Sequence, residues 1–194
     1  MKIKSNFFTV ILLLILFLTD DSDIFILLIS AFLHELGHIA VSRMLKIDLS
    51  EMRIGLFGAG LSCDTSSLSY THEIFLCLGG PITNFLTAPL GLLLIQKATA
   101  IAPLGETFVY ASLFLGTINL LPIKGFDGGR IFYASFSKLI SDKIAATLLS
   151  AASFAFIFMM WSFSLFFLLK YSFSLSMFIF SLSLFVKIFM EEDF

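Results

Sequence analysis

The stretch ISAFLHELGHIAVSRML, residues 29–45, decides how the rest of this sequence is interpreted. Its apolar residues are typical of a membrane-spanning helix, yet it contains His34, Glu35, His38 and Arg43. Ionisable side chains deep inside a membrane helix are costly, about 2.5–3.5 kcal/mol for a charged residue, and they usually mark a functional site. The stretch therefore raises two linked expectations, a membrane protein and a site within its membrane segment.

The composition supports the first expectation. Of 194 residues, 58% are hydrophobic and 13% are charged, and the mean hydropathy is +1.00. A soluble domain carries roughly 25% charged residues. The net charge of −2 argues against a nucleic-acid partner, and Cys63 and Cys77 fit no disulfide or metal-binding framework. We therefore expect an all-α polytopic membrane protein.

Six apolar segments reach or approach the roughly 20 residues that a helix needs to cross a bilayer. They lie at about residues 3–18, 24–45, 73–95, 104–121, 145–169 and 172–190. The first resembles a signal peptide, but it runs into Asp20, Asp21 and Asp23 without a small-x-small cleavage site. We expect it to be retained as a transmembrane helix.

The segment between the second and third spans, residues 46–72, is too polar and glycine-rich to cross the membrane. Its middle, residues 52–62, is better described as short extended strands broken by glycines. The sequence therefore predicts a short strand-like, membrane-associated segment between these two spans.

Positive residues predict the orientation, because Lys and Arg gather in cytoplasmic loops. Most of them fall on one side of the six predicted spans: Lys2, Lys4, Arg43, Lys46, Arg53, Lys124, Arg130, Lys138, Lys143 and Lys187. Lys97 and Lys170 fall on the other side. We expect an integral protein of a bacterial cytoplasmic membrane, with both termini and the active-site opening facing the cytoplasm.

His34 and His38 have the H-E-x-x-H spacing. Residues i and i+4 of a helix share a face, with Cβ atoms about 5–6 Å apart, so that two imidazoles can bind one Zn²⁺. Glu35 can then act on a water molecule at that metal. The chain has three histidines, and two of them form this pair. Packing could explain one buried histidine but hardly two with a glutamate between them.

A catalytic zinc takes three protein ligands and one water. His72, Glu73 and Asp64 are candidates for the third ligand, but they lie in or beside the polar loop, where a solvated side chain is the simpler interpretation. Asp127 is better placed, because it follows the fourth span at its cytoplasmic end and precedes two glycines. An alternative role for Asp127 is the N-cap of the next helix.

A second irregular stretch lies in the third span. Gly79, Gly80 and Pro81 are expected to interrupt this helix near its cytoplasmic start, which leaves Asn84 one turn deeper. Kinked membrane helices are common, so these residues alone are weak evidence. By depth, however, this break, the histidine pair and the segment around Asp127 fall in the same leaflet.

Taken together, three motifs resemble the site-2 protease family of intramembrane zinc metalloproteases. His34 to His38 matches H-E-x-G-H, GGPITN (residues 79–84) is similar to G-x-x-x-N, and NLLPIKGFDGG (residues 119–129) is similar to N-x-x-P-x-x-x-x-D-G. They occur in the family's order over the first two thirds of the chain. The resemblance is to the compact branch without a PDZ or nucleotide-sensing domain, which includes the sporulation-type relatives that process pro-factors.

The resemblance implies one Zn²⁺ per chain, with Asp127 as its third ligand and Glu35 as the catalytic residue. It also implies that Asn84 and Asn119 position the substrate or stabilise the intermediate, together with Gly79, Gly80 and Pro81. The substrate path would be lined by a strand region consisting of Arg53, Ile54, Gly55, Leu56 and Phe57.

The expected domain is a single integral membrane metalloprotease domain over residues 1–194, with a catalytic core at about 24–135 and C-terminal helices at about 145–190. The expected partners are the lipid bilayer and the transmembrane segment of a membrane-protein substrate. A regulatory membrane partner and a homo-oligomer are both left open. The rival hypotheses are a metal-ion transporter, for which the sequence lacks internal pseudo-symmetry, and a catalytically silent relative that only binds membrane segments.

Overall fold

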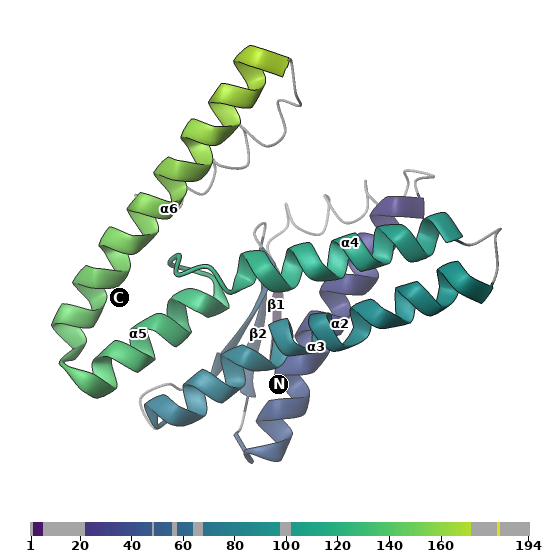
Figure 1. Cartoon of the computed structure of the whole chain (residues 1–194). Helices are drawn as coiled ribbons and strands as arrows, with labels where there is room; N and C mark the ends of the chain where they lie inside the picture. The colour runs from purple at the N-terminus through teal and green to yellow at the C-terminus, as the bar shows by residue number, and fades with distance from the viewer. Residues whose placement is uncertain are drawn as a thin grey trace. The chain divides into compact units, whose positions relative to one another are not determined.

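The computed structural model describes residues 2–5, 22–47, 49–55, 58–63, 68–97, 102–171 and 182. The chain forms two compact units, Met1–Leu120 and Leu121–Phe194, which are described in turn. The first contains β1 (Lys2–Ser5), α2 (Ser22–Met44), β2 (Leu49–Gly55), β3 (Gly58–Cys63), α3 (Tyr70–Lys97) and α4 (Ala102–Asn119). The second contains α5 (Asp127–Leu139) and α6 (Asp142–Tyr171) (Figure 1).

Three helices among the described residues are long and apolar enough to cross a membrane, namely Ser22–Met44, Tyr70–Leu93 and Asp142–Lys170. They correspond to the spans predicted second, third and fifth along the chain. The fourth predicted span forms α4, a helix of 18 residues that is not among these three. The described residues thus confirm a largely helical membrane-type fold, while the count of six spans stays a prediction.

The two terminal spans lie almost wholly outside the described residues. The span at 172–190 does so apart from residue 182, and the span at 3–18 apart from its first residues. Those first residues belong to strand β1, so the expectation that a helix begins at residue 3 is wrong. The alternation of lysine with Ile3 and Ser5 is the period-two pattern of a strand, and β2 provides a pairing partner.

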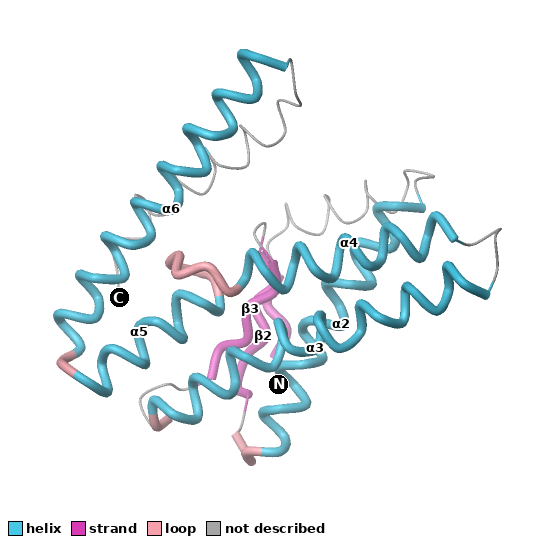
Figure 2. Tube along the Cα trace, viewed as in Figure 1, coloured by secondary structure: helices cyan, strands magenta, loops and turns pink. Residues whose placement is uncertain are grey.

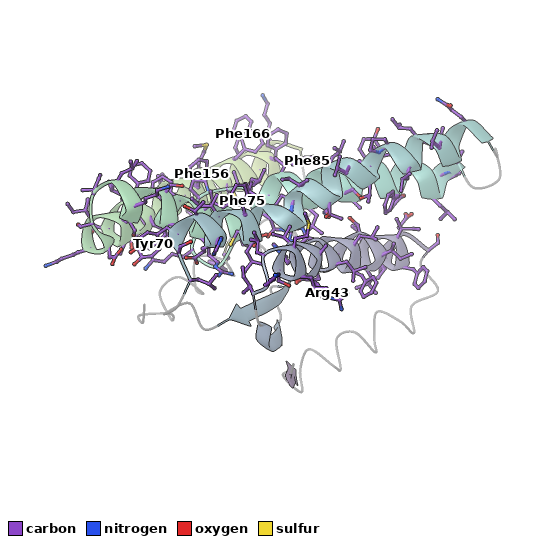
Figure 3. The ribbon with its side chains drawn as sticks, turned by 90° about the horizontal axis from the view of Figure 1, so that it is seen from below. Arg43, Tyr70, Phe75, Phe85, Phe156 and Phe166 are labelled. Atoms are coloured by element: carbon purple, nitrogen blue, oxygen red, sulfur yellow. The ribbon has the colours of Figure 1, made fainter. Side chains whose placement is uncertain are left out.

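Many of the buried side chains of the helices are polar or small, and many large apolar side chains are exposed. On α2 the buried residues share one face: Ser30, His34, Gly37, His38 and Ser42. Phe32, on the opposite face, is 63% exposed, and Phe75 also projects outward from α3 (Figure 3). This arrangement is unfavourable in water and suits a bilayer, where lipid tails solvate the apolar face and interhelical contacts favour small and polar residues.

Glycines let the helices of the first unit approach closely. A Cβ added to Gly79 of α3 would lie 2.7 Å from the carbonyl oxygen of Gly37 on α2, so the two backbones touch where the helices cross. Gly91 of α3 and Gly105 of α4 form a second such crossing, where an added Cβ would lie 2.7–2.8 Å from the facing carbonyl oxygen. These close contacts compensate for the missing hydrophobic driving force between helices in lipid.

Two polar contacts join α2 to α4. The buried hydroxyls of Ser30 and Ser112 lie 3.1 Å apart, and the hydroxyl of Thr107 donates to an oxygen of Asp23 at 2.8 Å. The residue number rises from Asp23 to Ser30 on α2 and from Thr107 to Ser112 on α4, so the two helices run parallel. The glycine contacts place α3 antiparallel to both, and Figure 1 shows α3 and α4 side by side.

The C-terminal end of α2 is followed by a residue with a left-handed backbone conformation. Lys46 has φ 55°, the Ile47 N–H donates to the Ser42 carbonyl at 2.8 Å, and the Lys46 N–H donates to the Arg43 carbonyl at 3.2 Å. These two bonds form a Schellman motif, in which glycine is the preferred residue at the position of Lys46.

The three strands form one sheet with β2 in the middle (Figure 2). β1 pairs with β2 in parallel and β3 pairs with it antiparallel, with Arg53 of β2 opposite Lys4 on one side and Gly60 on the other. The structure therefore has strands in the segment predicted to be extended, and the membrane association of that segment stays a prediction.

In the second unit, α5 packs against α6. Their buried side chains are mostly small or aliphatic, such as Ala134 on α5 and Ala145, Leu149 and Ile157 on α6. Phe166 of α6 is 51% exposed, in keeping with a helix that faces lipid (Figure 3). The expectation that both units act as one catalytic domain stays a prediction.

Candidate metal centre

His34 and His38 lie on the buried face of α2 and are 4% and 6% exposed. Their Nε2 atoms are 3.2 Å apart, and their rings meet edge to face with centroids 4.9 Å apart. Two nitrogens that are each about 2.0–2.1 Å from a tetrahedral zinc lie roughly 3.3–3.4 Å from each other. The observed spacing therefore fits two ligands of one metal ion.

A carbonyl group fixes the tautomer of His38. Its Nδ1 lies 2.8 Å from the carbonyl oxygen of Leu76 on α3, and because a carbonyl can only accept, Nδ1 carries the hydrogen. In a neutral imidazole, Nε2 then keeps a lone pair directed at His34. Metal-binding histidines are commonly oriented by such a bond from the other ring nitrogen.

Gly80 leaves room beside the histidine pair. A Cβ added to this glycine would lie 2.6 Å from Nε2 of His34 and would also clash with Nε2 of His38. Any other residue would thus occupy space next to both nitrogens that face each other. Gly79 and Gly80 consequently differ in role: Gly79 allows the helices to cross, and Gly80 clears the space in which the histidine nitrogens can bind a ligand.

The predicted interruption of the third span at these glycines and Pro81 is wrong, because α3 is one helix from Tyr70 to Lys97. Pro81 has no N–H and cannot donate to the carbonyl four residues before it in the helix ladder. Helix-breaking residues are tolerated in membrane helices where side chains and neighbouring helices satisfy the backbone. The tight packing against α2 keeps this segment helical.

Glu35 follows His34 on α2 and is half-buried. At 3.6 residues per turn it points about 100° away from His34 and about 60° away from His38 around the helix axis. Glu35 therefore lies beside the imidazole pair and not on the opposite face of α2. This position suits a group that exchanges protons with a molecule held near the histidines.

Asn84 is completely buried one turn beyond Gly80 and on the same side of α3. Neither its amide oxygen nor its amide nitrogen has a hydrogen-bond partner among the described residues. Leaving a buried polar group unsatisfied costs about 1–3 kcal/mol, so this side chain calls for a functional explanation. Its Cβ packs against Gly116 of α4, where an added Cβ would lie 3.3 Å away.

Comparison with known proteins adds an independent line of evidence. The sequence model of peptidase family M50 matches residues 96–163. These residues are similar to peptidase family M50. A zinc metalloprotease of Methanocaldococcus jannaschii, MJ0392, is 33% identical over 134 residues, which make up 64% of this chain and 39% of the relative. This chain thus spans about two fifths of that relative's length.

The fold is also that of a solved protein. The structure of a site-2 protease from Methanocaldococcus jannaschii matches with a TM-score of 0.73 at 21% identity, covering 99% of this chain and 91% of that chain. At this level of identity the match establishes the fold. It confirms the fold expected from the motif resemblance.

The M50 match includes Asn119 and Asp127 and does not extend to the histidine pair. Asn119 is the last residue of α4, and its amide nitrogen donates to the Leu115 carbonyl at 3.0 Å. The amide nitrogen has a second hydrogen that this bond does not use. The role of Asn119 in stabilising an intermediate stays a prediction.

Asp127 is the first residue of α5, in the second unit, and is half-buried. The alternative that it serves as N-cap is wrong, because the N-cap is Phe126, which makes no side-chain capping hydrogen bond. The turn before α5, with Gly125 at φ 87°, places the aspartate one position further into the helix.

Other predicted site residues lie in α3, in the sheet or outside the described residues. His72 is exposed in the first turn of α3, Glu73 is half-buried beside it, and Asp64 lies outside the described residues. Of the predicted strand region, Arg53, Ile54 and Gly55 belong to β2, whereas Leu56 and Phe57 lie outside the described residues. Their contact with substrate stays a prediction.

Sequence reasoning did not find two of the contributions to the site. The Leu76 carbonyl that orients His38 is a backbone group and leaves no trace in the sequence. The contact of Gly37 with Gly79 depends on how α2 and α3 cross, although a small residue inside H-E-x-G-H is a signal that could have suggested it.

Proposed function

We propose that this chain is an intramembrane zinc metalloprotease, which hydrolyses a peptide bond in or near the transmembrane segment of another membrane protein. The proposal depends chiefly on one observation, the buried imidazole pair whose Nε2 atoms lie 3.2 Å apart beside Gly80. The M50 match and the zinc metalloprotease relative support the same chemistry.

The metal ligands in this proposal are His34 and His38 of the first unit and Asp127 of the second, the set that the motif resemblance implies. Two neutral imidazoles and one carboxylate are a ligand set that zinc enzymes use, with one coordination position left for the reaction. Asp127 lies within the region that matches the M50 family. The Leu76 carbonyl supports the assignment by holding His38 with the lone pair of Nε2 directed at His34.

Zn²⁺, when bound, supplies Lewis-acid activation of water and of the peptide carbonyl. Glu35 accepts the proton of the attacking water and transfers it to the nitrogen of the leaving amine. Because Glu35 lies beside the histidines, one residue after His34, the same side chain can make both proton transfers. Glu35 is therefore the general base and then the general acid.

Asn84 is the better candidate of the two asparagines for contact with the substrate backbone. Its buried amide has no hydrogen-bond partner among the described residues, whereas Asn119 uses its amide nitrogen within α4. A well-aimed donor to a developing oxyanion lowers the activation free energy by about 3–4 kcal/mol. Gly79, Gly80 and Pro81 act by keeping α3 close to α2 and by leaving space beside the histidines.

A helical substrate hides its carbonyl groups, so the cleaved segment must unwind and pair its backbone elsewhere. β2 is paired on both sides, which leaves the outer edges of β1 and β3 for an added strand. β1 carries Lys2 and Lys4, which protect an edge against pairing, whereas β3 (GAGLSC) carries no charge. The substrate segment accordingly adds beside β3.

The membrane setting is part of the proposal. The chain crosses a bacterial cytoplasmic membrane several times and opens its site toward the cytoplasm. This orientation is in keeping with Arg43 at the end of α2 (Figure 3) and with the basic residues that follow α4 in the sequence. Its partner is a membrane protein with a transmembrane segment that can be locally unwound.

The decisive experiment compares wild type with Glu35→Gln in cells that produce a tagged membrane reporter. Glu35→Gln should keep its zinc and lose cleavage by a factor of at least about 100, whereas Glu106→Gln on the exposed face of α4 should cleave normally. Undiminished cleavage by Glu35→Gln contradicts the base assignment. Zinc uptake by vesicles, without cleavage by wild type, would favour a transporter.

A further inference from the structure

The turn before Asp127 is held in place by a serine of α6. The Oγ atom of Ser153 accepts a hydrogen bond from the Lys124 N–H at 2.9 Å and donates to the Leu149 carbonyl of its own helix, 2.7 Å away. The Pro122 carbonyl is 3.4 Å from the same hydroxyl. Ser153 is completely buried, so this bond is shielded from competing water.

The same turn is clamped from its other side by α5. A Cβ added to Gly129 would lie 2.8 Å from the carbonyl carbon of Ile123 and 3.3 Å from the Lys124 nitrogen. Ile123 is fully buried and Phe126 is 7% exposed. Residues 122–126 are thus fixed between Gly129 of α5 and Ser153 of α6, immediately before the aspartate.

We infer that Ser153 is a positioning residue for the metal centre, because its hydroxyl fixes the turn that sets where the Asp127 backbone begins α5. This inference rests on the proposed role of Asp127 as a zinc ligand. It assigns a function to α6, in which the sequence motifs had identified no functional residue. Groups that orient metal ligands typically change metal affinity 10- to 100-fold when they are removed.

The test uses substitutions that differ only in the hydroxyl. Ser153→Thr and Ser153→Val have the same shape, and only threonine can accept the Lys124 bond and donate in turn. Ser153→Val and Ser153→Ala should raise the free zinc concentration for half-occupancy of the purified protein about 10-fold. Ser153→Thr should stay near wild type. Ser150→Ala, which removes only a bond to Ala146 within α6, is the matched control and should have no effect.

A second measurement needs no metal. In zinc-free protein, hydrogen–deuterium exchange of residues 121–126 should rise roughly 5-fold in Ser153→Val and not in Ser153→Thr, because one backbone amide loses its partner. Equal zinc affinity of Ser153→Val and Ser153→Thr would overturn the inference, whatever the exchange rates are. If Asp127→Ala binds zinc normally, the ligand assignment itself fails, which is a separate outcome.

Discussion

Replacing Gly80 with alanine should remove zinc binding while leaving the fold intact. The new Cβ would lie 2.6 Å from Nε2 of His34, whereas ordinary contacts begin at 3.4 Å, so the ring has to move by about 0.8 Å. Zinc–nitrogen bonds are about 2.0–2.1 Å long and tolerate deviations of only about 0.2 Å. The displaced imidazole can no longer bind, and affinity for zinc should fall at least roughly 100-fold.

The stability of Gly80→Ala should change much less than its affinity. Overpacking costs about 1–3 kcal/mol, and replacing glycine by alanine within a helix returns about 1 kcal/mol. The assay is a zinc titration of the purified protein with helicity followed by circular dichroism. Gly116→Ala is the control, since its Cβ would meet Phe85 and Asn84 at 3.2–3.4 Å, away from the histidines. Wild-type zinc affinity in Gly80→Ala would refute the reasoning.

Three further predictions follow from single contacts. Asn84→Leu should stabilise the protein by about 1–3 kcal/mol, because it removes a buried amide that has no hydrogen-bond partner among the described residues, and it should lower cleavage. A lower thermal unfolding temperature than that of wild type would contradict the functional role of Asn84. Lys46→Gly should stabilise it by up to about 1 kcal/mol by relieving the left-handed backbone at φ 55°, as thermal unfolding can measure. Asp127→Ala should lower zinc content, and unchanged content by metal analysis would exclude Asp127 as a ligand.

The part of the site that lies within one helix was predictable from the sequence. The spacing of His34 and His38 fixes a shared face because helix geometry is local, and the structure places both nitrogens 3.2 Å apart. Glu35 follows from the same geometry. The three long apolar helices were predictable as well, because a run of about 20 apolar residues has few alternatives to a helix in lipid.

What depends on contacts between distant segments was not predictable. The helix-breaking pattern at Gly79 to Pro81 suggested an interruption, but the close contact of Gly79 with Gly37 keeps α3 continuous. The pairing of β1 with β2 joins residues about 49 positions apart in the chain, such as Lys4 and Arg53. Nothing local in either segment specifies such a partner.

X-ray absorption at the zinc edge of the purified protein tests the central claim most directly. We predict one zinc per chain, coordinated by two imidazole nitrogens with oxygen atoms in the remaining positions, at about 2.0–2.1 Å. The two-imidazole signature should disappear in His38→Ala. Protein that binds no stoichiometric zinc, or a zinc spectrum that lacks the imidazole pair, would contradict the account.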